Sequence, residues 1–230
     1  MLETVFKTID KVRDKRRASH LVRSEHLELP GSFPELLNHE EELAGLREEY
    51  HALHTHYTTS VSDTFAAISL PQVALLAWLV RTQPFQRILD TGSGFSSFVL
   101  RREAMRKTGV THYAVEDNIY WLGRTKEFLA GHDLPSDQVL SWDEFQADTK
   151  LTGFDFAYHD MGNMTTRIIS LPEIERRASP SAWLILDDMH KAAYWPHAQR
   201  MLGDRWIVQS LVELTLDEHD RYAYICRRKP

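Results

Sequence analysis

The chain has 230 residues, 43% of them hydrophobic and 26% charged, and a formal net charge of −6. This length and composition predict one globular domain with an elaboration, and the negative charge argues against a general nucleic-acid surface. The single cysteine, Cys226, excludes an internal disulfide and a cysteine-based zinc site. The most apolar run, residues 66–80, is too short to span a membrane and predicts a buried helix. We therefore expect a cytoplasmic protein that binds neither a membrane nor nucleic acid.

Residues 1–62 predict an N-terminal helical cap. Between Lys7 and Arg23, basic and apolar residues alternate at partly helical spacing, which is typical of a solvated amphipathic helix; contact with RNA or a membrane is the alternative. A proline-containing break follows, and residues 34–57 resume as an acidic helix. The opposite charges of these two helices could pair within the chain or across a homodimer, and the sequence does not distinguish the two.

From residue 63 to residue 230, strand and helix patterns alternate, which predicts an α/β domain with a doubly wound sheet covered on both faces. The predicted elements are helix 64–82, strand 86–90, helix 95–107, strand 111–116, helix 119–130, strand 137–141, strand 154–159, helix 166–178, strand 182–187, helix 192–202, strand 205–213 and strand 219–227. The last two strands are expected to form a hairpin through residues 215–218.

The first predicted strand runs into an acidic residue and a Gly-x-Gly turn, DTGSG at residues 90–94, and the chain then restarts as a helix. Glycine suits a tight turn that lies close to a ligand, and the start of a helix offers unpaired N–H groups. Such a turn by itself can serve backbone geometry alone. The second predicted strand ends in Glu116, however, where an acid can hold the hydroxyl pair of a ribose. Two corners thus indicate a nucleotide-type ligand.

The neighbouring residues separate the candidate ligands. Asp90 lies two residues before Gly92, and Ser96 stands where a dinucleotide-binding fingerprint has its third glycine. A carboxylate here repels a pyrophosphate and suits a cationic amino acid. Residues 63–230 therefore resemble the class I S-adenosylmethionine-dependent methyltransferases, with their Asp/Glu-x-Gly-x-Gly motif and Rossmann-like seven-stranded sheet ending in an antiparallel hairpin. The resemblance implies that S-adenosylmethionine is the methyl donor and is bound by Asp90, Gly92, Ser93, Gly94, Ser96, Glu116 and Asp117.

Aromatic side chains follow the second and third predicted strands. Trp121 begins the helix after Glu116, and Trp142 lies between Ser141 and Asp143. The two indole rings could flank the adenine of the donor, with Ser141 or Asp143 bonding its edge; packing in the core is the alternative.

Aspartates end the fourth and fifth predicted strands. Asp160 follows strand 154–159, and Asp187 and Asp188 lie at the end of strand 182–187. Adjacent ends of a doubly wound sheet open on one crevice, so the three carboxylates would repel one another unless something cationic lies between them. A hard divalent ion with oxygen ligands is the economical explanation, and capping of the following helices is the alternative.

This set of acids resembles that of the metal-dependent catechol O-methyltransferases and their bacterial natural-product relatives, including macrolide-sugar enzymes. The resemblance implies that Asp160, Asp187 and Asp188 bind Mg²⁺ beside the methyl donor. It departs at Asn163, where the catechol enzyme has a lysine base. We take His190 as the candidate base because an imidazole titrates near neutrality.

His159 and Lys191 are the further candidates for the base. His159 precedes Asp160 on an alternating strand and is expected to face the other side and pack.

These features predict a metal-assisted O-methyltransferase acting on a hydroxyl of a small molecule or natural product, with His190 and Asp160 as catalytic residues. A magnesium ion would lower the pKa of that hydroxyl. A nicotinamide-dependent oxidoreductase and a catalytically inactive methyltransferase-like partner subunit are the alternatives. The sequence does not specify the acceptor.

Overall fold

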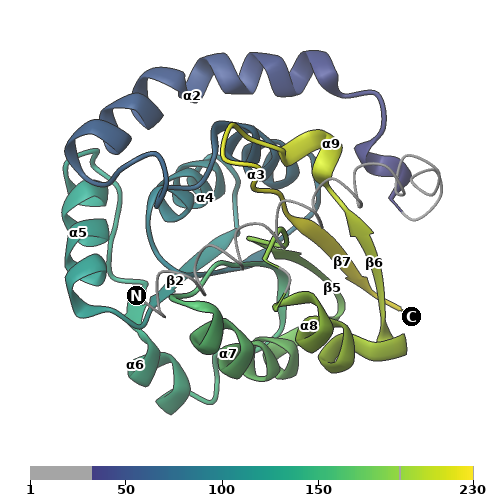
Figure 1. Cartoon of the computed structure of the whole chain (residues 1–230). Coiled ribbons are helices and arrows are strands. Elements are labelled where there is room, and N and C mark those ends of the chain that lie inside the picture. The colour runs from purple at the N-terminus through teal and green to yellow at the C-terminus, as the bar shows by residue number, and fades with distance from the viewer. Residues whose placement is uncertain (1–32, 192, 230) are drawn as a thin grey trace, which may run out of the picture.

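The computed structural model describes residues 33–191 and 193–229, and across them seven strands form one sheet in the order β3-β2-β1-β4-β5-β7-β6 (Figure 1). The strands are β1 Arg87–Thr91, β2 Thr111–Glu116, β3 Val139–Ser141, β4 Phe154–His159, β5 Ala178–Leu186, β6 Trp206–Ser210 and β7 Tyr224–Arg228. Neighbouring strands are parallel except that β7 runs antiparallel to both β5 and β6. The predicted Rossmann-like sheet with a C-terminal antiparallel hairpin is confirmed.

Helices cover both faces of this sheet, because successive strand residues point to opposite sides. Ile88 packs in the core layer beneath the first group of helices, and Leu89 packs in the layer beneath the second. The first group is α2 Glu40–Ser60, α3 Leu70–Thr82, α4 Phe95–Met105 and α5 Ile119–Ala130. The second group is α6 Trp142–Ala147, α7 Met164–Arg177 and α8 Trp195–Leu202. Short helices η1 Pro34–Leu36, η2 Gly203–Arg205 and α9 Val212–Thr215 complete the described elements.

The main boundary error concerns α3. The helix begins at Leu70 and not at residue 64, because Ser69 caps it by accepting a hydrogen bond from the Gln72 backbone N–H at 3.4 Å. Pro71 occupies the first turn, where its missing N–H costs nothing. Residues 61–69 therefore form a connection between α2 and α3 and not a first turn of helix.

Two short helices were not predicted as helices. Ser141 and Glu144 form a capping box that starts α6 directly after β3, and this Ser-x-x-Glu spacing is readable in the sequence. Helix α9 occupies the end of predicted strand 205–213, so the connection between β6 and β7 is longer than the expected turn. The sheet itself is unaffected by either difference.

The described part of the predicted N-terminal cap, residues 33–62, joins the same core as the sheet. Helix α2 lies on the outside of the first layer (Figure 1), and its Tyr50 and Tyr57 are buried in that layer. Arg81 of α3 links α2 to α4, because it pairs with Glu49 of α2 at 2.9 Å and with buried Glu103 of α4 at 2.7 Å. The boundary predicted at residue 62 and the homodimer stay predictions.

The basic segment from Lys7 to Arg23 lies outside the described residues. None of the helices that the structure describes combines the length and apolar character needed to cross a bilayer.

Candidate active site

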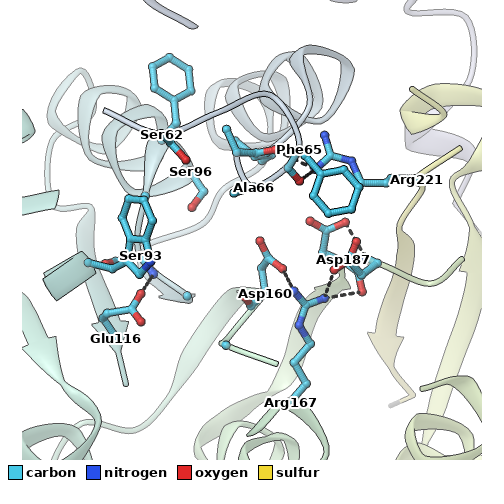
Figure 2. A pocket seen from close by; sticks show the side chains of 18 of the residues that line it. Ser62, Phe65, Ala66, Ser93, Ser96, Glu116, Asp160, Arg167, Asp187 and Arg221 are labelled. Atoms are coloured by element: carbon cyan, nitrogen blue, oxygen red, sulfur yellow. Dashed lines mark hydrogen bonds and ion pairs between the residues drawn. The ribbon is translucent and has the colours of Figure 1, made fainter. Parts of the chain in front are cut away.

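A cavity of about 320 Å³ opens at the carboxyl ends of β1, β2, β4 and β5 (Figure 2). This is the edge where doubly wound sheets bind their ligands. The predicted site residues that line it are Gly92, Ser93, Gly94, Ser96, Glu116, Trp121, Asp160, Asp187 and Asp188. Lys191, a further candidate base, also lines it, together with residues that the sequence analysis did not assign to the site: Tyr57, Ser62, Phe65, Ala66, Ala67, Ile68, Phe95, Gly162, Arg167 and Arg221.

The turn after β1 requires glycine at residue 92. Gly92 has a φ of +94°, a backbone conformation that side chains disfavour. A Cβ atom placed on it would lie 2.3 Å from the carbonyl oxygen of Asp160, well inside van der Waals contact. The chain after β4 thus passes directly beside the turn after β1, and this close approach brings Asp160 to the cavity.

Asp90 lies beneath this turn as a fully buried carboxylate. Its Oδ2 accepts hydrogen bonds from the hydroxyls of Ser96 at 2.9 Å and Ser97 at 2.5 Å. Its Oδ1 is buried, and the described residues offer it no hydrogen bond. Burial raises the pKa of Asp90 to about 7, although the two serines lower it. A cation bound at the corner would favour the ionised form of this carboxylate.

Glu116 joins the ends of β1 and β2. Its Oε2 accepts a hydrogen bond from the Ser93 N–H at 2.7 Å, and its Oε1 accepts one from the Asn118 N–H at 3.0 Å. Burial raises the pKa of Glu116 to about 7. Trp121 of α5 lines the same cavity. A carboxylate and an indole that line one cavity are suited to a ribose and an aromatic base.

The other predicted adenine contacts lie elsewhere. Ser141 is occupied as the cap of α6, accepting a hydrogen bond from the Glu144 N–H at 3.2 Å. Trp142 packs on Phe145, with ring centroids 5.6 Å apart. Neither of these residues is among those lining the cavity, and the same holds for Asp143 and Asp117. The structure therefore groups Trp121 with Glu116, whereas Trp142 joins the packing beneath β3.

The opposite half of the cavity holds the three predicted acids around Arg167 of α7. The guanidinium pairs with Oδ1 of Asp160 through Nη2 and with Oδ2 of Asp188 through Nη1, the latter at 2.9 Å. Figure 2 shows Asp160 and Asp187 on either side of Arg167. Lys191 also pairs with Asp188. Asp188 has a φ of +57°, a conformation uncommon for residues other than glycine.

Asp187 is held by hydrogen-bond donors. Gln72 Nε2 donates to its Oδ1 at 2.6 Å, and the Tyr158 hydroxyl donates to its Oδ2 at 2.6 Å. The backbone N–H of Asp188 also donates to Oδ1, at 2.6 Å. Both oxygens of Asp187 are thus engaged by neutral donors.

These contacts do not fit the predicted magnesium site. Mg²⁺ demands near-octahedral oxygen coordination, and its ligands must offer free lone pairs toward one point. Asp160 and Asp188 instead converge on the Arg167 guanidinium, and Asp187 is turned to Gln72 and Tyr158. Among the described residues, no group of three acidic, histidine or cysteine side chains is arranged to hold an ion. The cation that pairs with Asp160 and Asp188 in this structure is the guanidinium of Arg167.

The two histidines near Asp160 have different surroundings. His159 is fully buried, with Nδ1 2.7 Å from Thr91 Oγ1 and Nε2 3.1 Å from the carbonyl of Arg167. Burial lowers the pKa of His159 to about 3, so the ring is neutral and structural. His190 has its Nδ1 3.5 Å from Asp188 Oδ1 and is not among the residues lining the cavity. Lys191 is.

The segment between α2 and α3, residues 61–69, covers the cavity and is held from both sides. Arg221 donates to the carbonyls of Phe65 at 2.6 Å, Ala67 at 3.0 Å and Thr64 at 3.1 Å. On the other side, Arg124 of α5 donates to the Ser60 carbonyl at the end of α2, at 3.1 Å, and to the carbonyl of Val61, the first residue of the segment, at 3.4 Å. These backbone contacts carry no local sequence pattern. The position of Arg167 could have been noticed in the sequence, because this residue lies one helical turn after Asn163, the N-cap of α7, and seven residues after Asp160.

No protein-family model matches the chain, and no curated protein matches it in sequence. Solved structures do match in fold. An O-methyltransferase from Bacillus cereus in complex with SAH has a TM-score of 0.59 at 17% identity, covering 84% of this chain and 93% of its own. The methyltransferase PaMTH1 from Podospora anserina, bound to SAH, has a TM-score of 0.58 at 17% identity, covering 88% and 100%.

The O-methyltransferase TomG from Streptomyces achromogenes, involved in tomaymycin synthesis and in complex with SAM, has a TM-score of 0.55 at 17% identity, covering 85% and 93%. The chain therefore has the fold of S-adenosylmethionine-dependent methyltransferases.

Proposed function

We propose that this protein is a class I S-adenosylmethionine-dependent methyltransferase. The observation that carries the proposal is the paired corner at the ends of β1 and β2, where the turn at Gly92 and the carboxylate of Glu116 border one cavity. The neighbours solved with SAH or SAM share this fold and support the same ligand class. Glu116 would hold the ribose, Trp121 the adenine, and the turn at residues 92–94 the amino-acid portion of the donor.

Replacement of Glu116 tests the donor site. We expect Glu116→Ala to weaken SAH binding by about 1.5–3 kcal/mol, the scale of a charge-assisted hydrogen bond, which is roughly 10- to 150-fold in Kd. Isothermal titration calorimetry measures the effect. Glu127→Ala, on an exposed part of α5, is the matched control and should bind SAH normally. Heat on addition of NAD but none with SAH would instead indicate an oxidoreductase.

We further propose that the acceptor is a hydroxyl of a small molecule. The neighbours from Bacillus cereus and Streptomyces achromogenes are O-methyltransferases, and the latter is involved in tomaymycin synthesis. Phe65 and Ala66 line the cavity above Asp160 and Asp187 in Figure 2, and Ile68 also lines it. Apolar and acidic walls facing one another suit an acceptor with a flat or aliphatic body and a hydroxyl directed at Asp160.

The chemistry of transfer places limited demands on the protein. S-adenosylmethionine supplies an electrophilic methyl group, so the chain must align the acceptor and receive its proton. Asp160 borders the cavity and pairs with Arg167 through Oδ1. Burial, together with Asp187 and Asp188, raises the pKa of Asp160, although Arg167 opposes the rise. A carboxylate with a raised pKa is a better proton acceptor. We therefore assign the proton to Asp160, ahead of His190.

Single-turnover methylation separates these two residues once an acceptor is found. We expect Asp160→Asn to slow methyl transfer by roughly 10²- to 10⁴-fold, the range for loss of a general base, while SAH affinity changes little. His190→Gln should retain most of the rate, because its ring does not line the cavity. The reverse pattern, a large loss in His190→Gln with a shifted acidic limb of the pH profile, would assign the proton to the histidine as the sequence predicts.

A further inference from the structure

Arg167 is placed where a cation is needed. Three carboxylates meet at the ends of β4 and β5, and like charges at such distances cannot all remain ionised without compensation. The Arg167 side chain is only 5% exposed, yet its two terminal nitrogens reach acids on two different strand ends. Its Nη1 also lies 3.4 Å from the Asp187 carbonyl, and its Nη2 lies 3.4 Å from the Asp160 carbonyl. The guanidinium thus bridges both strand ends.

A planar guanidinium and a magnesium ion satisfy acids in different ways. Arginine is always charged and presents donors in a fixed fork, so it can bind two carboxylates at once without a pH-dependent loss of charge. A divalent ion bound by Asp160 and Asp188 would have to approach the buried positive charge of Arg167, which already pairs with one oxygen of each acid. The two cations therefore compete for the same acids.

We propose that Arg167 takes the place of the divalent ion that the resemblance to catechol O-methyltransferases implies, so that the site works with an internal, fixed cation. Arg167 acts as a positioning residue: it holds Asp160 at the cavity and Asp188 in its left-handed conformation. The acceptor hydroxyl then meets a carboxylate and not a metal. The inference rests on the proposed function only for the role of Asp160 in transfer; the exclusion of metal stands apart from it.

Binding of Mn²⁺, followed by electron paramagnetic resonance, tests the proposal without any need for activity. With the wild-type protein, alone or with SAH, we expect the signal of free Mn²⁺ to stay unchanged. Arg167→Gln removes the cation and leaves the acids together, so this variant should bind Mn²⁺ at least roughly tenfold more tightly than the wild type. Arg167→Lys keeps the charge and should again exclude the ion.

Arg176→Gln is the matched control, because Arg176 lies at an exposed position of the same helix and pairs with Glu173 at 2.6 Å, away from the three aspartates. It should behave as the wild type does. Tight Mn²⁺ binding by the wild-type protein would overturn the proposal, and this measurement is decisive even if Arg167→Gln does not fold. A folded Arg167→Gln protein that binds no more Mn²⁺ than the wild type would also contradict it. Failure of SAH binding by calorimetry would reject the methyltransferase function and leave the metal result unaffected.

Discussion

Asp90 shows how a single residue of the donor corner can be unfavourable for folding. Its carboxyl is fully buried, two serine hydroxyls bond one oxygen, and burial still raises its pKa to about 7 from an ordinary value of 3.8. The folded protein therefore holds a proton on Asp90 between these two pH values, whereas the unfolded chain does not. Stability contributed through this group falls as pH rises from about 4 to 7 and is lowest above pH 7.

Replacing Asp90 by asparagine should remove this dependence. We compare the unfolding free energy of Asp90→Asn with that of the wild type at each pH. This difference should be about 1–3 kcal/mol more favourable to the variant at pH 8 than at pH 5. Urea unfolding of the ligand-free protein at the two pH values measures it. Asp204→Asn, at an exposed position, is the control. An equal difference between Asp90→Asn and wild type at both pH values would show that the carboxyl is ionised throughout.

At the scale of the elements, the close contact between the segments that follow β1 and β4 determines the geometry of the site. The turn after β1 and the segment after β4 touch at Gly92 and Asp160, where a Cβ would come within 2.3 Å of a carbonyl oxygen. Parallel pairing of β1 with β4, which places Thr91 beside His159, brings the two turns together. A motif glycine is required here by the neighbouring strand as well as by its own φ of +94°.

Gly92→Ala should therefore destabilise the protein by on the order of 2–4 kcal/mol, because both backbone strain and a clash with backbone oppose the new methyl group. Gly123→Ala supplies the comparison. Gly123 lies inside α5 with nothing within 4 Å of an added Cβ, so alanine there should stabilise by about 0.5–1 kcal/mol. Chemical unfolding of the two variants measures both effects. Similar stability of the two variants would contradict the close backbone contact between Gly92 and Asp160.

At the scale of the whole molecule, the cavity is closed by parts of the chain that are far apart in sequence. Residues 61–69 follow α2, but Arg221, just before β7, holds their carbonyls, and Arg124 of α5 holds the end of α2. Arg221 is itself fixed by Asp217 at 2.7 Å. The connection between α2 and α3 and the loop before β7 thus meet over the site, and the order of residues 61–69 depends on both Arg221 and Arg124.

Arg221→Gln should loosen this cover while leaving the sheet intact. We expect faster amide hydrogen exchange in residues 61–69, little change in Tm, and weaker SAH binding, since exposed backbone opens with a low local free energy when its partners are lost. Exchange followed by mass spectrometry locates the effect. Arg200→Gln, at an exposed position of α8, is the control. Unchanged exchange in the segment would mean that Arg221 does not hold it.

Local patterns in the sequence determined the sheet, the glycine corner and the acid at the end of β2. Each of these depends on a few neighbouring residues: apolar alternation makes strands, glycine permits a positive φ, and predicted strand 111–116 and helix 119–130 match β2 and α5. The sequence likewise placed Asp160, Asp187 and Asp188 at strand ends on one edge, because parallel strands end together.

Only the tertiary structure decided what compensates those acids and what covers the cavity. The choice between Mg²⁺ and Arg167 depends on where α7 lies against the sheet, since the position of Arg167 one turn after Asn163 does not by itself show which acids its guanidinium reaches through space. The same holds for Arg221, which bonds the Phe65 carbonyl from 156 residues away. A backbone carbonyl is present at every residue, so no residue type marks the ones that will be bound.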